Sequence, residues 1–209
     1  MRAPNKPGWD RRSFLISTGF AGLAPCAFAQ APDADMPFAA KVAVGAELRA
    51  QKNEVYDPAY VKLAYPMGDV PDDRGVCTDT VIRAFRHAAV DLQVEVHEDM
   101  ARSFAAYPKS WGLTRPDRNI DHRRVPNLET FFRRKGGART PSRTASDYQA
   151  GDVVSWRLTG SGLPHIGVVT RKWIRNTPLV AHNIGAGTQM EPCLFDWPMT
   201  GWFRFENWA

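Results

Sequence analysis

The stretch RGVCTDTVIRAF, residues 74–85, decides how the rest of the chain is interpreted. Gly75 permits a tight or left-handed turn. After it, apolar residues recur with the spacing of one helix face, at Cys77, Val81, Phe85 and Ala88. Cys77 is therefore predicted to begin a helix, where the positive end of the helix dipole favours a thiolate over a thiol. The plainer interpretation is a small buried cysteine without a chemical role, since free cysteine is among the most buried residue types.

Outward from this stretch, the chain predicts helices first and strands afterwards. Apolar residues recur with helical spacing at 38–51 and 91–104, and a further short helix is predicted from Leu128 to Gly136. The last third is rich in β-forming residues bounded by glycine, at 152–158, 165–170, 179–183 and 202–205. This order is typical of an α+β fold with an antiparallel sheet. We expect residues 30–209 to form a single domain, since no linker or internal repeat divides them.

Two histidines lie on neighbouring predicted strands, and they are candidates for chemistry. His165 begins its strand, and His182 ends the next one. If these strands pair antiparallel, the two histidines lie near each other, as a catalytic base and the group that orients it must. A nucleophilic cysteine needs such a base to take its proton. Each histidine alone is more simply a hydrogen-bonded residue at a strand end. The combination with Cys77 favours a catalytic set.

The first 29 residues are typical of an export signal. Arg11 and Arg12 precede an uncharged run, and Ala27-Phe28-Ala29 is a small-x-small cleavage site. The paired arginines resemble a twin-arginine signal, which predicts a periplasmic protein cleaved after Ala29. The apolar run is too short to span a bilayer comfortably, so we expect no membrane insertion after cleavage. Cys26 is a poor lipid anchor because a proline precedes it.

The charge and cysteine content of the chain limit the kinds of binding partner and the covalent links that we expect. The net charge of +5 includes four basic residues and one acidic residue of the export signal, so about +2 remains in the mature chain. There is no basic run interleaved with aromatic residues, and we expect no nucleic-acid partner. Cys77 and Cys193 are the cysteines of the mature chain. In an oxidising compartment they could form a disulfide, which is the structural alternative to a catalytic Cys77.

These residues together resemble a known family. A cysteine that begins a helix, GDVVSW at 151–156, HIGVV at 165–169 and a polar strand end at His182 are similar to the NlpC/P60 papain-like cell-wall hydrolases. Over about residues 40–208 the chain more closely resembles the DUF1287 family of that superfamily, in GVCTD at 75–79, IDHRRVPNL at 120–128 and HNIG at 182–185. The resemblance implies a papain-like α+β fold in which N-terminal helices, with the nucleophile at a helix start, pack on a small antiparallel sheet.

The resemblance also implies roles for individual residues. Cys77 would be the nucleophile, His165 the base and His182 the residue that orients the base. Tyr65, twelve residues before the cysteine, occupies the place of a tyrosine that shapes the site. NlpC/P60 enzymes usually carry an acid directly before the cysteine, whereas here Asp79 follows it. As a residue that flanks the nucleophile, Asp79 would line the substrate pocket, and Asn183 would also contact the substrate. A one-residue slip in strand register would replace His182 by Asn183.

The segment 120–128 adds two candidates for substrate binding. Arg123 and Arg124 could hold a substrate carboxylate in a bidentate manner. A salt-bridged turn, with Asp121 as one partner, is an equal alternative.

We therefore expect an exported cysteine hydrolase that cuts an amide bond in the stem peptides of peptidoglycan, without a cofactor and as a monomer. One alternative is a zinc site made of Cys77, His165 and His182, although no paired ligand spacing supports it. Another is an inactive papain-like domain that binds wall fragments. Lipid-thioester hydrolysis and acyl transfer, both known in the wider superfamily, stay open as well.

Overall fold

The computed structural model describes residues 35–208. The predicted export signal of residues 1–29, with its arginine pair, cleavage site and Cys26, lies outside the described residues. None of the helices within residues 35–208 has the length and apolar composition that crossing a bilayer requires.

A six-stranded sheet forms the C-terminal half of the described chain, and every pairing in it is antiparallel. In spatial order its strands are β3 (Ala138–Arg139), β8 (Met199–Phe203), β4 (Val153–Arg157), β5 (Pro164–Ile174), β6 (Thr177–Asn183) and β7 (Thr188–Glu191). The order β4–β5–β6–β7 follows the chain, as expected where short turns join neighbouring strands. The predicted α+β class with an antiparallel sheet is confirmed.

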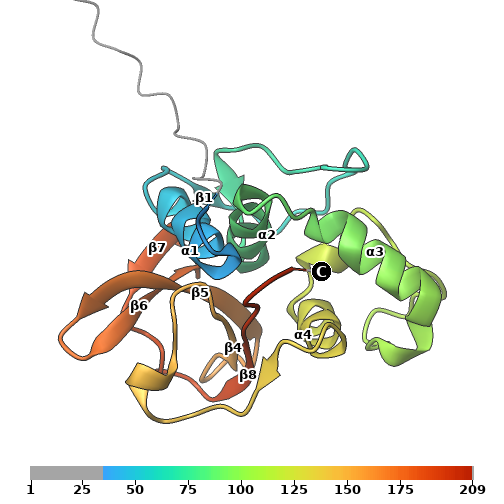
Figure 1. Cartoon of the computed structure of the whole chain (residues 1–209). Helices are drawn as coiled ribbons and strands as arrows, with labels where there is room; N and C mark the ends of the chain where they lie inside the picture. The colour runs from blue at the N-terminus through green and yellow to red at the C-terminus, as the bar shows by residue number, and fades with distance from the viewer. Residues whose placement is uncertain (1–34, 209) are drawn as a thin grey trace, which may run out of the picture. The chain divides into compact units, whose positions relative to one another are not determined.

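The helices precede the sheet in the chain, as predicted. They are α1 (Phe38–Arg49), α2 (Cys77–His87), α3 (Leu92–Ser103) and α4 (Val125–Arg134). Helices α1 and α2 pack against each other and against β5, while α3 and α4 continue the helical layer beyond α2 (Figure 1). Short 3₁₀ helices lie at Phe104–Ala106, Asp121–Arg123 and Ala145–Asp147.

The two faces of the sheet bury different sets of side chains. Since successive side chains in a strand alternate in direction, Ile166 and Val168 of β5 face α2 and join its core with Val81 and Phe85. Val169, one residue further along β5, joins a second cluster on the opposite face. That cluster also contains Tyr148, Val154, Trp156, Val180, Cys193, Leu194 and Trp202. The sheet is therefore covered on both faces around the point where β5 begins.

A two-stranded parallel pair lies apart from the main sheet, next to the start of α2. It consists of β1 (Val55–Tyr56) and β2 (Arg74–Gly75), with Tyr56 opposite Gly75. Strands of two residues carry no periodicity that a sequence could show, so this pair is not predicted. It brings a segment from before the loop 57–73 directly beside the residues that lead into Cys77.

Candidate active site around Cys77, His165 and His182

Cys77 is the first residue of α2, as predicted, and local contacts fix this start. Val76 is extended before the helix, and its N–H donates to the Asp79 carboxylate at 2.7 Å. Gly75 is extended in β2 rather than left-handed. Its missing side chain still matters, because a Cβ there would lie 3.0 Å from the Cβ of Asp79. The glycine therefore permits close packing against the first turn, not a turn of its own.

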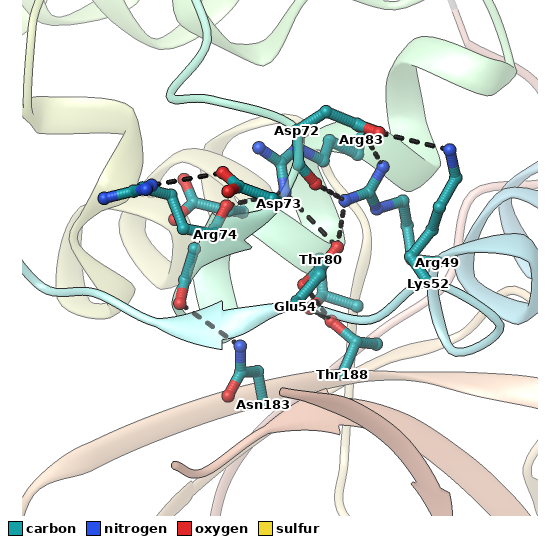
Figure 2. A network of polar contacts seen from close by, with 12 residues as sticks. Arg49, Lys52, Glu54, Asp72, Asp73, Arg74, Thr80, Arg83, Asn183 and Thr188 are labelled. Atoms are coloured by element: carbon teal, nitrogen blue, oxygen red, sulfur yellow. Dashed lines mark hydrogen bonds and ion pairs between the residues drawn. The ribbon is translucent and has the colours of Figure 1, made fainter. Parts of the chain in front are cut away.

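A buried polar network holds the segment that leads into Cys77. Arg83 donates to the carbonyl of Arg74 at 3.0 Å, and the side-chain amide of Asn183 donates to the carbonyl of Gly75 at 3.2 Å. Behind them, buried Glu54 accepts hydrogen bonds from Thr188 at 2.7 Å and from Arg83 at 3.4 Å (Figure 2). The network joins α2 to β6 and β7, so it fixes the helix start relative to the sheet.

Burial dominates the state of the Cys77 thiol. The residue is 9% exposed, and burial raises the pKa of the thiol to about 12, with a further rise from the nearby charge of Asp79. The backbone amides of Ile166, Thr78 and Cys77 itself act in the opposite direction. The sequence-based expectation of a thiolate at the helix start is therefore wrong for the resting protein, because desolvation outweighs the helix dipole.

The two candidate histidines contact each other directly. His165 Nε2 lies 2.9 Å from His182 Nδ1, and the rings are 2% and 0% exposed. The predicted proximity of these histidines on adjacent antiparallel strands is confirmed. Trp156 stacks on the His165 ring at 5.8 Å between centroids. Trp197 lies edge-on to both rings, 5.7 Å from His165 and 6.0 Å from His182.

Cys77 contacts β5, the strand that carries His165, at the residue that follows this histidine. Its thiol interacts with the backbone amide of Ile166, which follows His165 on β5. Within residues 35–208 the sulfur makes no hydrogen bond to either histidine ring. Because His165 uses Nε2 to contact His182, Nδ1 is its other nitrogen for proton transfer. Because side chains alternate along a strand, the His165 ring points away from the face of β5 on which Ile166 packs against α2, so the structure shows no direct contact between the Cys77 thiol and the histidine pair.

Both rings are neutral at pH 7. Burial lowers the pKa of His165 to about 3, and the charge of His182 adds to this effect. Burial also lowers the pKa of His182, although the Glu191 carboxylate, 3.0 Å from its Nε2, and Asp196 act to raise it. Neutral His165 is the form that a general base requires.

The candidates for substrate binding have partners within the protein. Arg123 binds the Asp79 carboxylate through two hydrogen bonds of 2.8 and 2.9 Å, and both side chains are 2% exposed. Arg124 pairs with Asp121 at 3.0 Å, which confirms the salt-bridged alternative, and lies 4.1 Å over the ring of Trp111. The Arg123–Asp79 pair ties the 3₁₀ helix Asp121–Arg123 to α2. The charged groups of Asp79, Arg123 and Arg124 are thus engaged within the protein, and their binding of a substrate stays a prediction. Asn183 is likewise engaged with Gly75.

The tyrosine near the thiol is Tyr56, not Tyr65. Tyr65 packs against His97 of α3, with 5.4 Å between ring centroids, and against Arg118. Tyr56 lies opposite Gly75. Burial raises the pKa of its hydroxyl, and the charges of Cys77 and Asp79 raise it further. Sequence reasoning missed this residue because a fixed offset from the cysteine does not reveal a parallel pairing.

A cleft adjoins the histidine pair on the side of the sheet opposite α2. It has a volume of about 630 Å³ and is lined by residues 141–143 and 194–199. Trp197 forms part of its wall and also contacts both histidine rings. This role of Trp197 was not predictable from the sequence, since the residue lies in an irregular segment between β7 and β8.

The structure bears on the two rival interpretations of Cys77. Among residues 35–208 no cluster of at least three histidine, cysteine or acidic side chains could hold a metal ion. The two histidine nitrogens face each other instead of a common centre. Cys77 and Cys193 are free, buried thiols in separate core clusters on opposite faces of the sheet.

Comparison of the whole chain with known proteins gives a matching family model and a similar protein. A family model described as "Domain of unknown function (DUF1287)" matches residues 43–205. The chain is 60% identical over 165 residues to a protein of Escherichia coli (strain K12) named "Uncharacterized protein YijF", an alignment that covers 78% of this chain and 80% of that protein.

Proposed function

The chain belongs to the DUF1287 family, and we propose that it is an exported cysteine hydrolase with a papain-like NlpC/P60 fold that cuts an amide bond in peptidoglycan stem peptides. The observation that carries this proposal is the 2.9 Å contact between His165 Nε2 and His182 Nδ1 at the start of β5, where the backbone amide of the next residue, Ile166, contacts the thiol of Cys77 from the other face of the sheet. A nucleophile, a base and a group that orients the base are the parts that covalent hydrolysis needs.

The state of the thiol determines how the reaction would begin. Because the pKa of Cys77 is raised to about 12, the resting thiol carries its proton at neutral pH. In the proposed reaction, substrate binding brings His165 Nδ1 within reach of the sulfur, and this nitrogen takes the proton as the sulfur attacks the substrate carbonyl. The backbone N–H of Cys77, at the start of α2, donates to the oxyanion that forms. His165 then protonates the leaving amine, and water hydrolyses the thioester.

The substrate class rests on the resemblance to cell-wall hydrolases and on the predicted export signal. A peptide bond suits the chemistry, because a buried base that is neutral at pH 7 can first accept a proton and then return it to an amine. The cleft beside Trp197 offers room for part of a substrate next to the histidines.

Mass spectrometry of purified peptidoglycan digested by the protein tests this proposal. We expect new stem-peptide fragments with the wild type and with Cys193→Ala, and none with Cys77→Ala. Cys193 is a matched control, since it is also a free and buried thiol. Binding of muropeptides without any fragment would indicate a wall-binding domain instead. Activity on a thioester alone would indicate the acyl-transfer or lipid-thioester alternative.

A further inference from the structure

Glu191 extends the histidine pair by one more polar group. This residue ends β7, the strand next to β6, and its Oε2 lies 3.0 Å from His182 Nε2. Among the described residues His182 Nε2 has no hydrogen-bond partner of regular geometry, so the carboxylate acts on the ring mainly through its charge. The His182 side chain is 0% exposed and that of Glu191 is 48% exposed. A partly solvated carboxylate therefore faces a fully buried ring nitrogen.

A neutral imidazole has one N–H and one nitrogen with a free lone pair, so the pair can exist in two arrangements. In the first, His165 donates from Nε2 to His182 Nδ1. His182 then carries its proton on Nε2, towards Glu191, and His165 Nδ1 is unprotonated. In the second, His182 donates from Nδ1, its Nε2 lone pair faces the carboxylate, and His165 carries its proton on Nδ1.

The two arrangements differ in energy and in chemistry. The second places a lone pair 3.0 Å from a negatively charged oxygen in a buried environment, which is repulsive. It also leaves His165 without a lone pair on Nδ1, so that this nitrogen cannot accept a proton. The first arrangement has neither defect.

We propose that Glu191 is a positioning residue that selects the tautomer in which His165 Nδ1 is unprotonated and ready to accept a proton. That the proton comes from Cys77 rests on the proposed function. When it moves from the sulfur to His165 Nδ1, His165 becomes an imidazolium that still donates from Nε2 to His182. The negative charge of Glu191, acting through His182, then stabilises the positive charge.

Other charged groups also act on His182. His165 faces it from β5, Glu191 from β7, and Asp196 from the segment after β7 acts with the same sign as Glu191. Glu191 is the one whose carboxylate lies 3.0 Å from the ring nitrogen. Asp196→Asn therefore measures how much of the effect is a general field.

Long-range ¹H–¹⁵N correlation spectra of the purified protein at neutral pH test the proposal without any substrate. They report which nitrogen of each ring is protonated, and His165→Ala and His182→Ala assign the signals. We expect both rings to carry their proton on Nε2. In Glu191→Met, which keeps the side-chain length and removes the charge, we expect a population of His165 protonated on Nδ1. Glu98→Met, an exposed acidic position on α3, is the matched control. A wild-type His165 protonated on Nδ1, or unchanged tautomers in Glu191→Met, would overturn the proposal.

Turnover provides a second readout. We expect Glu191→Met to lower the rate of peptidoglycan cleavage by about 10- to 100-fold, the effect of losing an interaction with a charged group. The acid limb of the pH–rate profile should move to lower pH, because the lost negative charge had raised the pKa of the pair. Glu98→Met should change neither, and a Glu191→Met rate and profile equal to the wild type would count against the proposal. If the wild type has no Cys77-dependent turnover, the proposed function fails, while the tautomer spectra still decide the role of Glu191.

Discussion

The side-chain amide of Asn183 donates to the carbonyl of Gly75 at 3.2 Å, whereas the preceding residue, His182, faces His165 at 2.9 Å. Side chains alternate along a strand, so these neighbours on β6 point to opposite faces of the sheet. Their pairing with β7 places His182 opposite Gln189 and Asn183 opposite Thr188. Both residues that the sequence offered as the third member of the site are therefore used. His182 contacts His165, the proposed base, and Asn183 holds the segment before Cys77, the proposed nucleophile.

The histidine pair predicts an order of activities. His165→Ala should lose most of the rate, because an unassisted thiol with a raised pKa is almost fully protonated at neutral pH. His182→Asn should keep part of it, since the amide oxygen can accept from the His165 ring. His182→Ala should be worse than His182→Asn. Rates on muropeptides check this order, and equal rates for these two variants would show that His182 does not orient the base.

Asn183→Ala should act through the structure around Cys77. Losing its hydrogen bond leaves a buried carbonyl without this partner, which costs about 1–3 kcal/mol. We expect a lower midpoint in urea unfolding together with a partial loss of activity. Asn183→Asp, which keeps the size but lacks the donor, is the matched variant. A severe loss of activity with unchanged stability would instead make Asn183 a direct participant in the chemistry.

Cys77 should react slowly with iodoacetamide in the resting protein. Its pKa is raised to about 12, so little thiolate is present at pH 7–9. The labelling rate should stay below that of free cysteine and keep rising with pH through this range. Cys193→Ala isolates the signal of Cys77, since the pKa of Cys193 is raised to about 12 as well. Fast labelling at pH 7 that is already at its plateau would show a thiolate stabilised by the helix start.

The fold was predictable wherever the burial of one face of an element gives its apolar residues a regular spacing. Helix α2 and the central strands β4 to β6 carry an apolar pattern, and each lies where the sequence places it. Strand β7 was missed, because it has only four residues, of which two are exposed and one is half-buried, and it leads into Pro192. Strand β5 extends to Ile174, beyond the predicted end at Thr170, and its last four residues are exposed. Regular pairing without burial leaves little trace in a sequence.

The residues of the candidate site likewise fall into those that the sequence predicts and those that it does not. The pair His165–His182 followed from adjacent strands, and Cys77 followed from a helix start. Tyr56, Glu191 and Trp197 did not follow, because each is brought in by a short strand or an irregular segment. The pairing of Arg123 with Asp79 was not predicted either, since a sequence does not show that two charges far apart in the chain bind each other.

The buried pair Asp79–Arg123 predicts a large effect on stability. Arg123→Met removes one partner and leaves the Asp79 carboxylate buried beside Cys77, which should lower the free energy of unfolding by about 3–5 kcal/mol. The double variant with Asp79→Leu should regain much of this loss, because no uncompensated charge remains. Arg102→Met, which breaks the exposed pair with Glu98, should cost less than about 1 kcal/mol. Urea unfolding of the variants checks the prediction, and a mild effect of Arg123→Met alone would contradict it.

The lowered pKa of the buried His122 ring leads to a prediction of how the free energy of unfolding depends on pH. Its ring is 2% exposed, within the 3₁₀ helix Asp121–Arg123, and burial lowers its pKa from the ordinary 6.5 to about 3, with the charges of Arg86 and Arg123 adding to the effect. Between these two values the unfolded chain binds a proton that the folded chain does not. The contribution of His122 is therefore intact above about pH 6.5 and is lost as the pH falls towards 3, by up to about 1.4 kcal/mol per pH unit.

Replacing this ring should make the protein less sensitive to acid. His122→Leu has no group to protonate, so its free energy of unfolding should fall less steeply than that of the wild type between pH 6 and pH 4. His87→Leu is the comparison, because His87 is only half-buried and its pKa is lowered by burial alone. Its curve should stay closer to the wild type. His165 remains in both variants and also has a pKa lowered to about 3, so some acid sensitivity should persist in each. Urea titrations at several pH values measure these slopes, and parallel curves for His122→Leu and the wild type would mean that His122 protonates as easily in the folded chain as in the unfolded one.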